Sequence, residues 1–275
     1  MEASLFGLEG KSFIVLGGGQ GMGEATCNLL ADLGANVAVL DIIGERAERV
    51  AADIVKKKNN VRSLAITADV LDDDALVAAI ARAEKEIGPL DGMASIVGMA
   101  YMGSAIDIPM DLYDLDHQRN LRYIFLAARE VARNLIARGA PGSIVSVASV
   151  DGIQASTGHT SYGSAKAGLV HQAKSLAGEW SRYGIRVNVV APGAMITPRV
   201  RPGTEEKERE LMKLVPMQKR GGVNDIAKAL VFFLSDLSAY VTGQTLPVDG
   251  GYTAVGPIDY SGFGAIKGVT GVAPK

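Results

Sequence analysis

The stretch FIVLGGGQGMGEATCNLL, residues 13–30, passes from an apolar run through a cluster of glycines into a segment with helical composition. Glycines let the main chain approach a pyrophosphate closely, and the free N–H groups and dipole of a helix start favour a bound anion. The stretch therefore predicts a dinucleotide-binding turn, although a glycine turn without a ligand is an alternative that a lone cluster does not exclude. The positions expected to contact the dinucleotide are Gly17, Gly19, Gln20, Gly21, Met22 and Gly23.

An acidic residue ends the next apolar run. NVAVLD, residues 36–41, places Asp41 at 18 residues after Gly23. A carboxylate at this spacing accepts hydrogen bonds from both hydroxyls of an adenosine ribose and repels a 2′-phosphate. We therefore expect NAD rather than NADP, with Asp41 and Ile42 beside the ribose, and we interpret Arg46 as a surface residue.

The remainder of the chain repeats this alternation of apolar runs and helical segments, which predicts parallel strands joined by crossover helices. The runs are continuously apolar, as expected for a sheet covered on both faces. We predict an α/β fold over residues 1–253, a single doubly wound Rossmann-type domain of about seven parallel strands flanked by helices. The expected strands are SFIVL (12–16), NVAVL (36–40), RSLAIT (62–67), GMASIV (92–97), GSIVSVAS (142–149), RVNVVA (186–191) and TLPV (245–248).

Two segments stand outside the alternation. Residues 194–215 contain TEEKEREL, which predicts a short helix capped by Thr204 with acidic residues in its first turn. We expect this segment to form a lid over the substrate. The C-terminal tail, residues 254–275, is rich in glycine and has no clear period, so it is either a flexible end or a strap across a neighbour.

Composition limits the classes of partner. The formal net charge of −2 gives no general attraction to nucleic acid or to an anionic membrane. The single cysteine, Cys27, cannot form a disulfide within the chain, and no apolar run approaches the roughly 20 residues that span a bilayer. We see no secretory signal and expect a cytoplasmic protein with a small-molecule substrate. The three histidines show no metal-ligand spacing, so we expect no metal site.

A tyrosine and a lysine lie four residues apart in HTSYGSAKAGLV, residues 159–170. On a helix Tyr162 and Lys166 share one face, and a nearby ammonium lowers the pKa of a phenol from about 10, which suits general acid–base catalysis. An ordinary surface helix carries the same spacing by chance. The context favours chemistry, because Ser149 ends an expected strand at the edge where doubly wound sheets bind substrates. We interpret His159 as a solvated loop residue, with a place in the substrate pocket as the alternative.

Several motifs occur in an order and spacing that resemble the classical short-chain dehydrogenases/reductases over about residues 8–252. The matching positions are Gly17, Gly21 and Gly23, Asp69 with Val70, Asn120, Ser149, Tyr162 with Lys166, NVVAPG (188–193) with Thr197, and VDGG (248–251).

The resemblance implies a catalytic tetrad of Asn120, Ser149, Tyr162 and Lys166. Tyr162 exchanges a proton with the substrate oxygen and Ser149 orients that oxygen. Lys166 lowers the tyrosine pKa and binds the nicotinamide ribose, and Asn120 holds a water in the proton relay. The resemblance also implies that the chain forms a homotetramer or homodimer. It assigns further cofactor contacts to Asp69 and Val70 at the adenine, to Gly98 where the main chain passes close to the cofactor, and to Pro192, Gly193 and Thr197 at the carboxamide.

Two departures from the family pattern are visible. Leu16 stands where the family usually has threonine, and Ser95, Ile96 and Val97 replace its usual Asn-Asn-Ala before Gly98. Ile96 and Val97 cannot make the side-chain hydrogen bonds that tie this strand to its neighbours. We therefore expect the site to survive with altered cofactor affinity or altered local packing.

We expect an NAD-dependent oxidoreductase that interconverts a secondary alcohol and its ketone by hydride transfer. A non-catalytic dinucleotide-sensing protein on the same fold remains the alternative, and a methyltransferase would leave Ser149, Tyr162 and Lys166 without a role. The expected substrate pocket is mainly apolar, which favours an apolar and cyclic substrate. Its expected apolar residues are Met99, Ile153, Met195, Ile196, Val200 and Met212.

Overall fold

The computed structural model of the chain describes residues 3–58 and 60–256. Seven parallel strands form one sheet in the order β3-β2-β1-β4-β5-β6-β7, which confirms the predicted doubly wound topology. The chain order reverses between β1 and β4, and ligands of such sheets bind at this switch point. The strands are β1 (Ser12–Leu16), β2 (Asn36–Asp41), β3 (Ser63–Thr67), β4 (Gly92–Ser95), β5 (Gly142–Val147), β6 (Ile185–Pro192) and β7 (Thr245–Val248).

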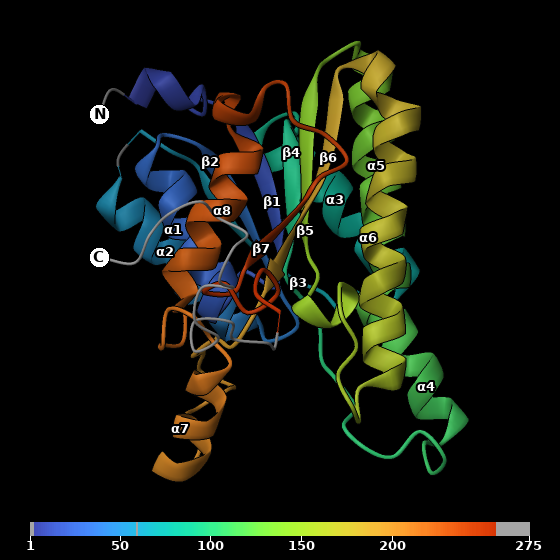
Figure 1. Cartoon of the computed structure of the whole chain (residues 1–275). Helices are drawn as coiled ribbons and strands as arrows, with labels where there is room; N and C mark the ends of the chain where they lie inside the picture. Colours follow the sequence, from blue (N-terminus) through green and yellow to red (C-terminus); the bar gives the residue numbers. More distant parts are fainter. Residues whose placement is uncertain (1–2, 59, 257–275) are drawn as a thin grey trace, which may run out of the picture.

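Helices cover both faces of the sheet, so the molecule has three layers (Figure 1). One face carries α1 (Gly21–Asp32), α2 (Gly44–Lys57) and α8 (Val223–Leu234), and the other carries α3 (Asp73–Ile87), α5 (Tyr123–Arg138) and α6 (Thr160–Trp180). Two smaller helices, α4 (Met110–His117) and α7 (Glu205–Lys213), project at the same end of the molecule. These two follow β4 and β6 in the chain, so they flank the edge where the strands end.

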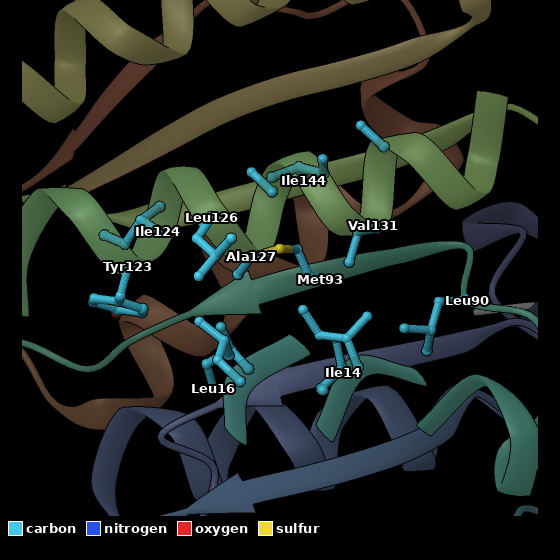
Figure 2. Close-up of a cluster of buried hydrophobic side chains, with 14 of the residues drawn as sticks. Ile14, Leu16, Leu90, Met93, Tyr123, Ile124, Leu126, Ala127, Val131 and Ile144 are labelled. Atoms are coloured by element: carbon cyan, nitrogen blue, oxygen red, sulfur yellow. The ribbon is translucent and has the colours of Figure 1, made fainter. Parts of the chain in front are cut away.

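Alternate side chains of β1 show why its sequence is apolar at every position. Ile14 and Leu16 pack in the cluster beneath α3, α5 and α6, whereas Phe13 and Val15 pack beneath α1, α2 and α8. All four side chains are buried. Figure 2 shows Ile14, Leu16 and Met93 of β4 gathered against α5. A continuous apolar run is what a strand needs when both of its faces are covered.

The predicted cap at Thr204 agrees with the structure, and glycines end two other helices. Helix α3 stops at Gly88 with φ 99°, and α5 stops at Gly139 with φ 61°, both in the left-handed region that favours glycine. Helix α7 begins after Thr204, whose hydroxyl accepts a hydrogen bond from Lys207 N at 3.4 Å. Strands β4 and β5 each end two residues earlier than predicted, because Val97 and Ser149 already belong to the loops that build the site.

The prediction for the C-terminal tail concerns residues 254–275, of which 257–275 lie outside the described part of the chain. Within residues 3–58 and 60–256, no helix has both the length and the apolar character needed to cross a membrane.

Candidate active site

The four residues of the expected tetrad converge from separate elements at the carboxyl edge of the sheet. Ser149 follows β5, Tyr162 and Lys166 lie in the first turns of α6, and Asn120 lies in a π-helical turn, Gln118–Arg122, between α4 and α5. Gly98, after β4, meets two of them. A Cβ atom there would come within 2.7 Å of Asn120 Oδ1 and 3.2 Å of Lys166 Nζ. This close approach explains why a side chain is excluded at position 98.

Lys166 lies beside Tyr162, as the four-residue spacing predicts. Its Nζ atom lies 5.6 Å from the centroid of the Tyr162 ring and donates a hydrogen bond to Val147 O at 2.8 Å. The side chain is almost fully buried, and this burial lowers the pKa of Lys166 to about 7. The end of β5 therefore anchors the amine against the tyrosine.

The expected lowering of the tyrosine pKa is wrong for this structure. Burial raises the pKa of Tyr162 to about 12, and a hydrogen bond with Ser149 lowers it only in part. The carboxylates of Asp151 and Asp116 add to the rise, since negative charge nearby disfavours a phenolate. The prediction considered only the charge of the ammonium next to the phenol, whereas the structure buries Lys166 and half-buries Tyr162. At neutral pH the phenol is therefore protonated and able to donate.

Asn120 ties the loop after β4 to the helical layer. Its Nδ2 donates to Met99 O at 2.8 Å and to Asp116 O at 2.9 Å, and its Oδ1 accepts from Met99 N at 3.3 Å. The residue is fully buried. A π-helical turn is a feature that recurs at functional sites, and here it places the amide next to Gly98 and Lys166.

The glycine loop packs tightly enough to serve as a phosphate cradle. A Cβ atom on Gly23 would lie 1.9 Å from Gly17 O, so only glycine lets α1 start this close to the end of β1. A Cβ atom on Gly19 would lie 2.6 Å from Asp41 Oδ2, which instead accepts a hydrogen bond from Gly19 N at 3.1 Å. The loop therefore needs glycine to pack between β1, β2 and α1, and a main chain without side chains at these positions fits a pyrophosphate.

Asp41 lies where the adenosine ribose is expected. Its carboxylate is buried and accepts from Gly19 N and from Ile43 N at 3.0 Å. A carboxylate has about four lone-pair sites, so two remain for the ribose hydroxyls. Ile42 is exposed beside it. The residues present therefore fit the adenosine half of a nicotinamide dinucleotide.

The two residues expected at the adenine differ in exposure. Asp69 is exposed and its Oδ1 accepts from Leu71 N at 2.9 Å. Val70 is buried in the core beneath α3. Asp69 is thus accessible to a ligand at the sheet edge, whereas Val70 next to it belongs to the buried core.

The segment after β6 crosses to the glycine loop. Gly193 N donates to Val248 O at 3.1 Å, and Thr197 Oγ1 accepts from Val200 N at 3.0 Å to close a turn. Pro198 in this turn lies against the loop, because a Cβ atom on Gly21 would meet its Cδ at 3.3 Å. Pro192, the last residue of β6, is buried. The positions expected at the carboxamide therefore lie between the ends of β6 and β1.

An ion pair joins α7, which belongs to the expected lid, to Arg220. Glu208 of α7 accepts from Arg220 Nε at 2.7 Å and from Nη2 at 2.8 Å, and also from Gly203 N at 2.8 Å. The Arg220 guanidinium lowers the pKa of Glu208 to about 2. Figure 1 shows α7 standing away from the three-layered body.

The sequence interpretation of His159 as a solvated loop residue is wrong. Its Nδ1 lies 2.7 Å from Asp151 Oδ2, and its side chain is only 25% exposed. The imidazole lies edge-on to Tyr162 with ring centroids 5.7 Å apart. The signal available in the sequence was an aspartate two residues after Ser149 and a histidine three residues before Tyr162.

The departures from the family pattern change the packing after β4. Ser95 Oγ is fully buried and has no hydrogen-bond partner among the described residues. The main chain compensates, since Ile96 N donates to Leu16 O at 2.9 Å and the Tyr123 hydroxyl donates to Val97 O at 2.7 Å. Main-chain oxygens of Leu16 and Val97 therefore join this segment to β1 and α5, while Ser95 and Ile96 stand at the two positions where asparagine is usual in the family.

Comparison with known proteins agrees with this geometry. The family model described as enoyl-(acyl carrier protein) reductase matches residues 17–253. The chain belongs to the classical short-chain dehydrogenase/reductase family. It is therefore an oxidoreductase of a family that binds a nicotinamide dinucleotide and acts on small molecules.

Characterised members of the short-chain dehydrogenase/reductase family are similar along almost their whole length. NAD-dependent glycerol dehydrogenase of Listeria innocua is 32% identical over 249 residues, 90% of this chain and 96% of the relative. The 2,5-dichloro-2,5-cyclohexadiene-1,4-diol dehydrogenase of Sphingobium indicum is 33% identical over 252 residues, 90% and 99% of the two chains. The crystal structure of levodione reductase superimposes with a TM-score of 0.83 at 29% identity and covers 90% of this chain and 99% of its own.

Proposed function

We propose that the protein is an NAD-dependent oxidoreductase that interconverts a secondary alcohol and its ketone. The observation that carries this proposal is the meeting of Ser149, Tyr162 and Lys166 at the sheet edge on which the glycine loop opens. The Ser149 hydroxyl lowers the pKa of Tyr162, and the buried Lys166 lies beside the Tyr162 ring, so a proton donor, an orienting hydroxyl and a tunable amine share one place.

The choice of NAD over NADP rests on Asp41. Its buried carboxylate lies against Gly19, so a 2′-phosphate bound there would meet a negative charge at short range. Arg46 is exposed on α2 and does not cancel this charge through an ion pair in the described residues. The name of the Listeria innocua relative is consistent with NAD use.

Tyr162 and Ser149 have separate roles: Tyr162 transfers a proton, and Ser149 orients the substrate oxygen. When bound, the nicotinamide supplies or accepts the hydride. In ketone reduction the Tyr162 hydroxyl gives its proton to the substrate oxygen, while Ser149 donates a hydrogen bond that holds this oxygen in place. Ser149 Oγ accepts from Asp151 N at 3.1 Å, and this bond orients the hydroxyl that donates to the substrate oxygen. Lys166, beside Tyr162, passes the replacement proton to the tyrosine, and Asn120 holds a water in this relay.

Apolar side chains line the loops around the tetrad. Met99 and Ile153 follow β4 and β5, and Ile196 and Val200 follow β6; all four are exposed in this structure. We propose that they cover a mainly apolar, cyclic substrate, with residues 194–215 as the lid. The names of the diol dehydrogenase and of levodione reductase agree with a cyclic substrate. We also propose that the protein is cytoplasmic and forms a homodimer or homotetramer.

A screen of secondary alcohols with NAD and NADP tests this function. The expected result is NAD reduction with at least one apolar cyclic alcohol, and a much weaker signal with NADP. Binding of NAD without turnover of any alcohol or ketone would favour the dinucleotide-sensing alternative and overturn the enzymatic proposal.

A further inference from the structure

A carboxylate and an imidazole form a pair next to the proposed proton donor. Asp151 lies in the 3-10 turn Val150–Gly152 that follows Ser149, and His159 is the residue before α6. The pair bonds through Asp151 Oδ2 and His159 Nδ1, 2.7 Å apart. The mechanism above assigns no role to this pair.

Neighbouring groups hold the pair in a fixed orientation. Asp151 N donates to Ser149 Oγ at 3.1 Å, and the second oxygen of its carboxylate accepts from the Ser156 hydroxyl. The Asp151 side chain is only 10% exposed. The His159 ring rests edge-on against Tyr162. The imidazole is thus oriented on one side by a carboxylate and on another by the catalytic ring, as in sites where a histidine must present one particular nitrogen.

The bond to Asp151 decides which nitrogen is available. A carboxylate accepts a hydrogen bond, so the neutral imidazole carries its hydrogen on Nδ1 and a lone pair on Nε2. Within residues 3–58 and 60–256, no group hydrogen-bonds to Nε2. His159 therefore offers a free hydrogen-bond acceptor one helical turn from Tyr162.

This acceptor lies beside loops that carry exposed apolar side chains. Gly103 N donates to Gly158 O at 3.0 Å, so the loop after β4 closes against the residue before His159. Met99, Met102 and Ile153 of these loops are exposed. A single oriented acceptor in apolar surroundings discriminates strongly between ligands with and without a matching hydroxyl, because mismatched polar groups lose their hydrogen bonds on burial.

We propose that His159 Nε2 accepts a hydrogen bond from a second hydroxyl of the substrate, on the carbon next to the one that is oxidised. The substrate class is then a vicinal diol on an apolar ring, and the Asp151–His159 pair determines this specificity. The inference rests on the proposed function, since it requires that Tyr162 binds the reacting oxygen.

Steady-state oxidation of matched cyclic alcohols with NAD tests the inference. The probes are cyclohexanol, 1,2-cyclohexanediol in its cis and trans forms, and 2-methoxycyclohexanol, which keeps the second oxygen without its hydrogen. The proteins are the unmodified chain, His159→Phe, Asp151→Asn, and His171→Phe as a control on an exposed histidine within α6. His159→Phe keeps a ring against Tyr162 and removes both nitrogens.

The expected result is a kcat/KM ratio of diol to cyclohexanol of about 10 or more for the unmodified chain, and no such advantage for the methoxy compound. His159→Phe lowers the ratio to within about 3-fold of unity, Asp151→Asn lowers it in part, and His171→Phe leaves it unchanged. An equal loss of kcat/KM on diol and cyclohexanol in His159→Phe would show that His159 only positions Tyr162 and would overturn the inference.

Oxidation of cyclohexanol without a diol preference in the unmodified chain would overturn the inference too, and would leave the proposed function standing. Turnover of none of the probes would contradict the proposed function for cyclic alcohols.

Discussion

The Nζ atom of Lys166 lies 5.6 Å from the centroid of the Tyr162 ring, with Lys166 buried and Tyr162 half-buried. Burial shifts the two pKa values in opposite directions, to about 12 for the phenol and about 7 for the amine. Each group thereby favours its neutral form, as desolvation requires. The acid–base chemistry of the site therefore depends on how the pair is buried as well as on its spacing.

Replacement of Lys166 by methionine should change how stability depends on pH. Between pH 7 and 10.5 the unfolded chain holds a proton on Lys166 that the folded chain has lost, so its contribution to the free energy of unfolding rises with pH. Relative to Lys166→Met, the unmodified chain should gain about 1 kcal/mol per pH unit over this range. Urea unfolding at pH 7, 8 and 9 measures the difference.

The matched control for this experiment is Lys174→Met, which changes an exposed lysine on the same helix. Its free energy of unfolding should follow that of the unmodified chain at each pH. A difference between Lys166→Met and the unmodified chain that stays constant from pH 7 to 9 would show that the amine is charged in the folded protein.

Replacement of Asp41 by asparagine should relax the preference for NAD. The substitution removes the charge that repels a 2′-phosphate and keeps an oxygen for Gly19 N. The ratio of kcat/KM for NAD over NADP should fall by about 10-fold or more. Measuring both dinucleotides on one variant cancels any loss of stability, and Asp32→Asn, an exposed aspartate at the end of α1, serves as the control. An unchanged ratio would remove Asp41 from the ribose site.

Replacement of Arg220 by glutamine should loosen α7. The guanidinium is the group that holds Glu208, and the low pKa of Glu208 means that the ion pair persists at neutral pH. A glutamate-specific protease should cut residues 205–210 several times faster, and KM for the alcohol should rise about 3- to 10-fold with a smaller change in kcat. Lys213→Gln breaks an exposed pair on the same helix and should change neither value. Equal protection in Arg220→Gln and the unmodified chain would show that other contacts hold the lid.

The strands of the sheet could be predicted because burial on both faces leaves a direct mark on the sequence, a continuous apolar run. Runs such as SFIVL at residues 12–16 are apolar at every position, and burial of Phe13 on one face and Ile14 on the other is the reason. The helix ends at Gly88 and Gly139 also have a local cause, since each position has a positive φ that favours glycine. Strand β4 was predicted two residues too long, because Ile96 and Val97 are apolar yet already belong to the loop.

The residues that form the site could be predicted from the sequence, but their burial, contacts and pKa values could not. The spacing of Tyr162 and Lys166 shows that they share a helix face, but the pKa of each depends on burial by segments distant in the chain. The Asp151–His159 pair was missed for a similar reason, since it joins the turn after β5 to the start of α6. The π-helical turn that carries Asn120 has no propensity signal that distinguishes it from an α-helix.

The most direct test of the account is the turnover of Tyr162→Phe with NAD and the best alcohol from the screen, measured beside its affinity for NAD. The substitution removes one hydroxyl and keeps the ring that packs against His159. The account predicts a fall in kcat of about 100-fold or more, with the dissociation constant of NAD within about 3-fold of that of the unmodified chain. A variant that binds NAD and retains most of its kcat would contradict the assignment of Tyr162 as the acid–base group.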